Sequence, residues 1–249
     1  MQQQTKPVEA AQRPSPSPAS GNGESRLTLL LSGALAAFLG LMTAGLLAAM
    51  AGLHHAIVVG PLTAIIGVAL FKQLPNNLAI PRLSRAVAVS LALVVLAAVV
   101  SNVLLRANLV VAGRDGGTYA NTASFLVDGA NLFPDAIAEP FIDQDLEFAS
   151  PGFVVRDDGT FWQQFLHSTS SALGFVGELF GRGAMFSFNG VLSGVGILSL
   201  FALGRRFMGE WWALAAAALM AATLPFVHFE RGTFTEIGTL VLVSGGLWA

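Results

Sequence analysis

Six apolar stretches, separated by polar connectors, dominate the pattern of this chain. A helix needs roughly 20 apolar residues to cross the hydrocarbon core of a bilayer. The second stretch is short and contains Pro61, whereas the first and third carry no charge. We therefore expect an all-α membrane protein with about six transmembrane helices. The stretches are residues 27–53, 56–71, 86–105, 184–203, 211–227 and 234–249.

Composition favours a lipid environment over water. Hydrophobic residues make up 54% of the chain and charged residues 11%, against about 25% charged residues in a typical soluble domain. The net charge of -2 suggests no nucleic-acid partner. The sequence contains no cysteine, which excludes disulfides, thiolate metal sites and a cysteine nucleophile.

Two regions are polar enough to lie in water. Residues 1–26 are rich in Gln, Pro and Ser and predict a disordered tail without a cleaved signal peptide. Residues 106–182 are acidic and contain no run that would cross a bilayer. We expect a tail (1–26), a transmembrane hairpin with its connector (27–85) and a membrane core (86–249). Since the sequence stops within an apolar stretch, we expect the core to continue beyond Ala249.

Basic connectors predict the orientation. The tail, the connector 72–85 and the turn with Arg205 and Arg206 all carry Lys or Arg, and such short segments stay in the cytoplasm. All three fall on one side if six stretches cross the bilayer. The chain is then a multi-pass protein of the cell membrane with a cytoplasmic N-terminus and an extracytoplasmic loop 106–182.

The extracytoplasmic loop predicts two interfacial amphipathic helices. In the first, Tyr119, Ala123 and Leu126 recur at helical spacing behind Asp115, which is either a helix cap or a functional acid. The second covers residues 160–180, where Gln164, His167 and Ser168 form a polar stripe. That stripe would meet a sugar or a phosphate, or it is simply a solvated helix face.

Further charged residues suggest ligand chemistry. The spacing Asp143-x-Asp145-x-Glu147 resembles a calcium site only superficially, so a solvated acidic loop is preferred and a divalent cation stays open. Arg231 is the best phosphate ligand in the chain, because its planar guanidinium can hold two oxygens. The alternative is a pair with Glu230 or Glu236 that only fixes helix ends.

Four segments, in this order, resemble the GT-C membrane glycosyltransferases, especially the protein mannosyltransferase and aminoarabinose transferase group. The likeness covers residues 86–249, the N-terminal part of such an enzyme. The hairpin before it and the absence of prolines in QFLHS depart from the family pattern. The segments are RDGGTYANTASFL (114–126), FLHSTSSALGF (165–175), NGVLSGVGILSLFALGRRFMG (189–209) and FERGTFTEI (229–237).

The resemblance implies inverting transfer of a sugar from a polyprenyl-phosphate donor to a glycan, lipid or protein acceptor at the outer membrane face. Asp115 matches the family's general base, and Tyr119 matches the aromatic residue that follows it. Arg231 and Glu236 match polar positions near the sugar-phosphate site, with His167 as a second candidate for the leaving phosphate. No cofactor is implied. The alternatives are a transporter or channel subunit, whose acids line a pathway, and a non-catalytic membrane scaffold.

Overall fold

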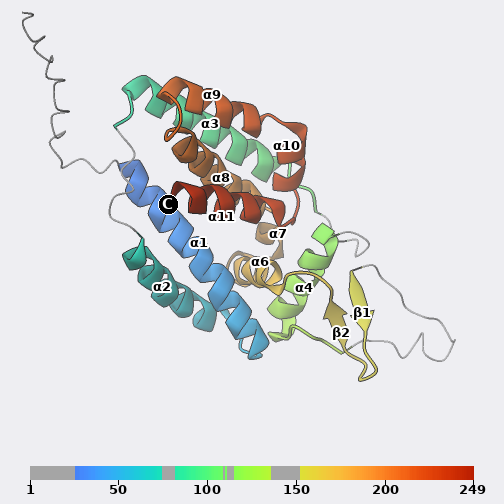
Figure 1. Ribbon diagram of the computed structural model, residues 1–249. Coiled ribbons are helices and arrows are strands. Elements are labelled where there is room, and N and C mark those ends of the chain that lie inside the picture. Colours follow the sequence, from blue (N-terminus) through green and yellow to red (C-terminus); the bar gives the residue numbers. More distant parts are fainter. Residues whose placement is uncertain (1–25, 75–81, 109, 111–114, 136–151) are drawn as a thin grey trace, which may run out of the picture.

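The computed structural model describes residues 26–74, 82–108, 110, 115–135 and 152–249. These residues form a mostly helical protein with one small antiparallel sheet (Figure 1). The elements are α1 (Arg26–Met50), α2 (Ala56–Gln73), α3 (Arg85–Leu104), α4 (Asp115–Gly129), β1 (Phe153–Val155), β2 (Phe161–Gln163), α6 (His167–Phe180), α7 (Arg182–Met185), α8 (Phe188–Gly204), α9 (Glu210–Ala221), α10 (Leu224–Glu230) and α11 (Glu236–Trp248).

Four described helical segments are long and apolar enough to cross a membrane. They are α1, α2, α3 and the segment Arg182–Gly204, which contains α7 and α8. α9 and α10 count as a fifth candidate when taken together, and α11 is apolar but has only 13 residues. The expectation of a mostly helical chain with several helices apolar enough to span a membrane is confirmed. By this criterion the described residues give at most five spans instead of the expected six.

The stretch 211–227, expected as one straight span, is broken into α9 and α10, which are bent by 65°. Pro225 stands in the first turn of α10. A proline lacks the N–H that would bond to the carbonyl four residues earlier, and its ring collides with that carbonyl. Residue 221 is that position, and it is the last residue of α9. The proline therefore accounts for the break.

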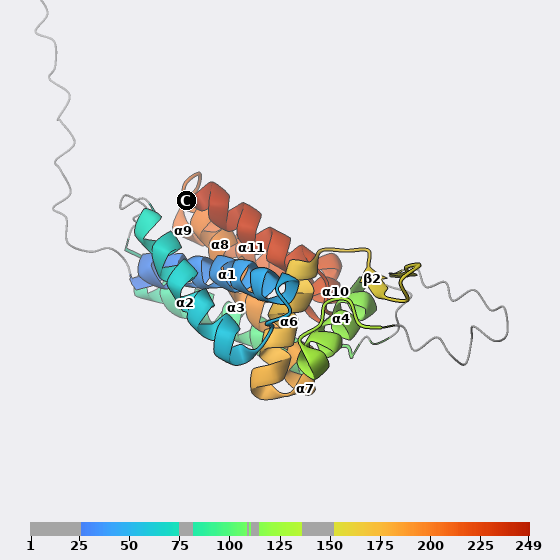
Figure 2. The ribbon, with the colours of Figure 1, turned by 90° about the horizontal axis from the view of Figure 1, so that it is seen from below.

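α8 lies at the centre of the bundle, where it contacts α3, α9, α11, α10 and α1. The main apolar core combines side chains of these helices, among them Leu91, Ile197, Phe201 and Val241. The starts of α1 and α3 and the α8–α9 turn gather at one end of the bundle. The α1–α2 turn, α4 and α6 gather at the other, where α6 runs across α1 (Figure 2).

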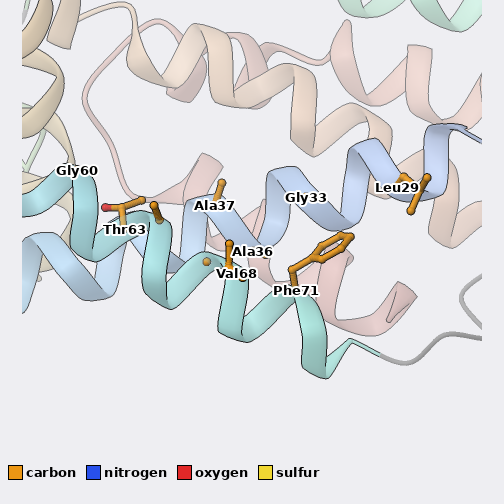
Figure 3. A pocket seen from close by; sticks show the side chains of 10 residues that line it. Leu29, Gly33, Ala36, Ala37, Gly60, Thr63, Val68 and Phe71 are labelled. Carbon is orange, nitrogen blue, oxygen red and sulfur yellow. The ribbon is translucent and has the colours of Figure 1, made fainter.

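α1 and α2 form a closely packed hairpin. Gly52, with φ +66°, ends α1: its N–H bonds to Ala49 O at 3.1 Å and that of Leu53 to Ala48 O at 2.8 Å, which is a Schellman cap. At the crossing point, a Cβ on Gly40 would lie 2.8 Å from the carbonyl oxygen of Thr63. An apolar pocket of about 460 Å³ also lies between the two helices (Figure 3).

The expected helix over residues 160–180 is wrong in its first part. β1 and β2 pair there with Val154 opposite Trp162, and the helix begins only at His167. β-branched and aromatic residues favour strands, and Gly159 at φ +80° serves the turn between them. The Trp162 ring is sandwiched, with Phe133 stacked at 4.3 Å and Arg156 3.7 Å from its centroid.

Two predictions fall outside the described residues. They are the disordered tail, of which residues 1–25 are not described, and the acidic triplet Asp143, Asp145 and Glu147.

Candidate functional site

Asp115 is the first residue of α4, and its side chain is exposed. The helix buries the expected residues Tyr119, Ala123 and Leu126 and packs mainly against α6. An acid in the first turn is favourable there because the helix N-terminus carries a partial positive charge. Asp115 is thus held at a fixed helix end while its carboxylate faces outward.

The loop between α10 and α11, which contains Arg231, contacts the start of α4. The hydroxyl of Thr233 donates a hydrogen bond to the backbone carbonyl of Gly116, the residue after Asp115. The backbone N–H of Ala107, just beyond α3, donates to the carbonyl of Arg231 at 2.6 Å. The loop is therefore fixed against both α3 and α4.

Asn189, at the start of α8, holds the same loop from the inside. It is buried, and its side-chain amide lies 2.7 Å from the carbonyl oxygens of Gly232 and Phe234 and 3.4 Å from that of Phe229. The carbonyl of Phe229 belongs to the last turn of α10, and those of Gly232 and Phe234 lie between α10 and α11, so none of them has a partner within a helix. One amide thus organises the backbone around Arg231.

A polar group that we term the Asn102 cluster consists of Asn102, Glu230 and Arg231. The Asn102 side-chain oxygen accepts a hydrogen bond of 3.1 Å from Arg231 Nε, and its nitrogen donates to Glu230 Oε1. Asn102 and Glu230 are each only 1% exposed, while Arg231 is half-buried. Among the described residues, Arg231 forms no ion pair with either Glu230 or Glu236, so the expected alternative of a pair that only fixes helix ends is wrong.

Tyr119 interacts with three polar side chains, Asp115, Thr235 and Glu236, and we term the four residues the Tyr119 cluster. The phenol ring is 4% exposed and packs against Phe165 at 5.8 Å. Burial raises the pKa of Tyr119, and the negative charges of Asp115 and Glu236 act on it in the same direction. Thr235 interacts with its hydroxyl. Tyr119 thus remains a neutral hydrogen-bonding group near two exposed carboxylates.

A small pocket adjoins the Tyr119 cluster. Its volume is about 130 Å³, and both Leu166 and Thr235, which contact the Tyr119 hydroxyl, contribute to its lining. The rest of the lining is mainly apolar and comes from α1, α6, α8 and α11. Its polar members are Ser168, Thr169, Asn189 and Thr239. An apolar cavity therefore lies directly beside a group of polar side chains.

Gln164 and His167 lie apart from this arrangement. Gln164 is exposed on the bend after β2, whereas its neighbour Gln163 is buried and accepts a hydrogen bond of 3.0 Å from Ser170 Oγ. His167 starts α6, with Nδ1 3.5 Å from Gln163 Oε1 and its ring edge-on to Phe133. Burial lowers the pKa of His167. The expected stripe of Gln164, His167 and Ser168 along one helix is therefore wrong, because Gln164 precedes that helix.

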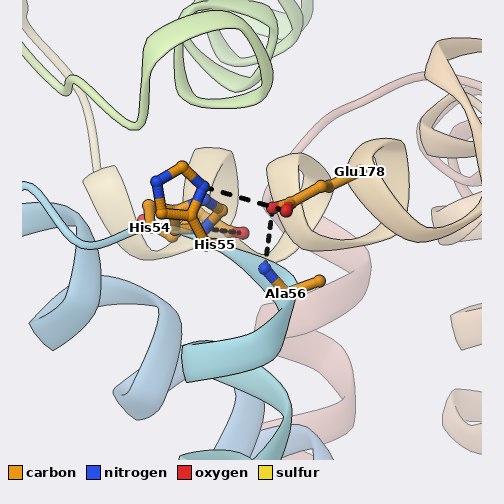
Figure 4. Close-up of polar contacts among 5 residues, drawn as sticks. His54, His55, Ala56 and Glu178 are labelled. Atoms are coloured by element: carbon orange, nitrogen blue, oxygen red, sulfur yellow. Dashed lines mark hydrogen bonds and ion pairs between the residues drawn. The ribbon is translucent and has the colours of Figure 1, made fainter.

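A histidine junction fixes the α1–α2 hairpin to α6 at the same end (Figure 4). His54 is fully buried, and its Nε2 lies 2.9 Å from the carbonyl oxygen of Ser171. Glu178 accepts a hydrogen bond of 2.8 Å from the backbone N–H of Ala56, and its other oxygen lies 3.9 Å from His55 Nδ1. The α1–α2 hairpin is thus an integrated part of this fold.

Reasoning from the sequence missed three residues that hold the site together: Asn102, Asn189 and Thr233. It named Glu230 only as a direct partner of Arg231. Asn102 was the available signal, since an amide within the apolar stretch 86–105 requires a hydrogen-bonding partner. No described residues form a group of three His, Asp or Glu side chains suited to a metal ion. The chain matches no protein family model, and comparisons with curated proteins and with solved structures find no match either.

Proposed function

We propose that this chain belongs to a membrane glycosyltransferase that takes a sugar from a polyprenyl-phosphate donor, with chemistry of the GT-C type. The observation that carries the proposal is the contact between Thr233 and Gly116, which brings the Arg231 loop against the helix end bearing Asp115. A candidate base and a candidate phosphate ligand then belong to one end of a bundle of apolar helices. A donor with a lipid tail and a charged head requires such a position.

Each residue has a distinct role in this proposal. Asp115 accepts the proton of the acceptor hydroxyl as that oxygen attacks the anomeric carbon, a contribution of roughly 10²–10⁴-fold in rate. The bond from the anomeric carbon to the phosphate oxygen breaks in the same step, and the lipid phosphate leaves with both electrons. Because attack and departure occur on opposite faces, the anomeric configuration inverts.

Arg231 stabilises the leaving phosphate in this scheme. Its Nε is engaged by Asn102, and its two terminal nitrogens donate to no described residue. Paired N–H groups of this kind fit two phosphate oxygens. In this scheme the exposed Glu236 hydrogen-bonds sugar hydroxyls, while the buried Tyr119, whose hydroxyl interacts with Thr235 and Leu166, supports the site from behind. The 130 Å³ pocket beside Thr235 would take a short apolar part of the donor.

Transfer by membranes that contain the full-length protein tests this function. The donors are a panel of radiolabelled pentoses and hexoses on decaprenyl and undecaprenyl phosphate. We expect Asp115→Asn to lower the rate by about 100-fold or more. The matched control is Asp128→Asn on the same helix, since Asp128 is exposed and pairs with Arg182. An unchanged rate for Asp115→Asn would remove it as the base, and no transfer by the wild type would reject the function.

Transport is a second candidate, favoured by the α9–α10 break. Transporters place ionisable groups in discontinuous helices, and Glu230 is buried at the end of α10. Charge-dependent uptake into vesicles that is lost in Glu230→Gln, with no sugar transfer, would favour transport. The glycosyltransferase proposal predicts no such uptake.

A further inference from the structure

Asn102 lies between the carboxyl group of Glu230 and the guanidinium of Arg231, which are consecutive in sequence. We propose that Asn102 is a positioning residue that keeps the Arg231 guanidinium from pairing with Glu230 and thereby leaves its terminal nitrogens free for an isoprenyl phosphate. This inference rests on the proposed function and assigns a role to a residue that does not touch the substrate.

Each half of the Asn102 amide has one partner, so its orientation is fixed. The oxygen can only accept, and it receives the hydrogen bond from Arg231 Nε at 3.1 Å. The nitrogen can only donate, and it binds Glu230 Oε1. If the amide were flipped, its nitrogen would face Arg231 Nε, donor against donor, and its oxygen would face Glu230 Oε1, acceptor against acceptor. Asn102 therefore separates carboxylate from guanidinium while it satisfies one atom of each.

Glu230 is a strong competitor for Arg231 because of where it lies. It is 1% exposed, and among the described residues its Oε2 has no hydrogen-bond partner. The Ser193 hydroxyl interacts with Glu230 and also lies 2.7 Å from the carbonyl oxygen of Gly190, to which it donates. A buried carboxylate with an open acceptor atom attracts a cation strongly, since water screens it little. Without the intervening amide, the guanidinium would rotate onto Glu230.

The backbone around Arg231 would not prevent that rotation, nor would it need to move. Ala107 N–H holds the Arg231 carbonyl, and Asn189 holds the carbonyls of Gly232 and Phe234. These contacts fix the main chain and leave the side chain to be directed by Asn102. Loss of Asn102 should therefore redirect one guanidinium while the loop keeps its shape.

Two readouts on the full chain in detergent test the inference. The first is the rate at which phenylglyoxal modifies Arg231, followed by peptide mass spectrometry with the exposed Arg106 as internal reference. The second is calorimetric binding of farnesyl phosphate, with inorganic phosphate as a separate arm. The variants are Asn102→Ala, Glu230→Gln and the double variant.

Asn102→Ala should slow modification of Arg231 and weaken farnesyl phosphate binding by about tenfold or more, as expected when a charge-assisted contact is lost. Adding Glu230→Gln removes the competing charge and should restore both values to within about threefold of wild type. Rescue distinguishes positioning from a structural role, because a second change in a damaged core would otherwise lower both values further.

Unchanged modification of Arg231 in Asn102→Ala, or a double variant no better than the single one, would overturn the inference. Phenylglyoxal needs no natural ligand, so this readout is independent of the proposed function. Rescue of modification without any farnesyl phosphate binding by the wild type would support the positioning role and reject the lipid-phosphate function. Equal affinity for inorganic phosphate would point to a free anion as the ligand.

Discussion

Thr233 donates its hydroxyl hydrogen bond to the backbone carbonyl of Gly116, so residues 117 positions apart in the chain meet at one point. Thr233 is 1% exposed. The contact joins the loop after α10 to the first turn of α4, and both candidate reacting groups lie within two residues of it. Asp115 precedes Gly116, and Arg231 precedes Thr233 by two positions. A site assembled from these groups depends on the contact between Thr233 and Gly116.

Asn189→Ala should weaken the packing of the α10–α11 loop against α4 and lower both the stability of the protein and its transfer activity. The change leaves up to three carbonyls without their donor, at a cost of about 1–3 kcal/mol for each buried group left unpaired. Thermal unfolding in detergent and the transfer assay measure the two effects. Asn121→Ala is the control, because its amide bonds to the Val110 carbonyl at an exposed position. Equal effects of the two changes would show that Asn189 does not organise the loop.

Gly40→Ala should destabilise the α1–α2 hairpin. The added methyl would lie 2.8 Å from the Thr63 carbonyl oxygen and 3.0 Å from the Gly67 nitrogen, and both are backbone atoms that cannot rotate away. Overpacking of this kind costs about 1–3 kcal/mol, seen as a lower Tm. Gly33→Ala, in the same helix with nothing within 4 Å, should keep or raise Tm, since alanine favours helices. A Tm for Gly40→Ala that matches Gly33→Ala would contradict the packing described.

Stability should fall as pH drops below about 6.5, partly because of His54. A carbonyl only accepts, so His54 Nε2 donates to Ser171 and the buried Nδ1 has no described partner. Burial lowers the pKa of His54 from 6.5, with Glu178 and His55 acting in opposite directions. Below pH 6.5 the unfolded chain binds a proton at His54 that the folded chain binds less readily. The free energy of unfolding is therefore retained above pH 6.5 and falls as the pH approaches the lower pKa of the folded state.

Unfolding at pH 7.5 and 5.5 measures this effect. The difference between the two should shrink in His54→Gln, although His167, whose pKa burial also lowers, keeps part of it. The half-exposed neighbour His55 provides the control as His55→Gln. If the pH dependence in His54→Gln equals that of the wild type, protonation of His54 does not destabilise the fold.

The sequence predicted the helices better than the contacts between them. Apolar length located α1, α2, α3 and α8 within a few residues, because a lipid-facing helix must be apolar along its whole length. Pro225 was visible but its effect was not used, so α9 and α10 were taken as one span. The strands at 153–163 were missed because they are three residues each and pair only with each other.

For the site, the sequence identified charged residues and missed the amides. Asp115, Tyr119, Arg231 and Glu236 stand out by charge or spacing, and the structure brings them to one end of the bundle. The roles of Asn102 and Asn189 depend on hydrogen-bond partners that are distant in the sequence, such as Glu230 for Asn102 and Gly232 for Asn189. Gln164 was chosen over Gln163 because a helix was expected there, whereas Gln163 ends β2 and is buried and Gln164 lies exposed on the bend that follows.

The functional proposal depends on Asp115 facing away from the cytoplasm at headgroup depth. Because residues 1–249 contain no cysteine, Asp115→Cys and Arg206→Cys each place a single cysteine in this chain. A membrane-impermeant maleimide on intact cells should label position 115 and reach position 206 only after permeabilisation. Labelling of position 206 but not 115 on intact cells would contradict the proposal and leave only a helical membrane protein.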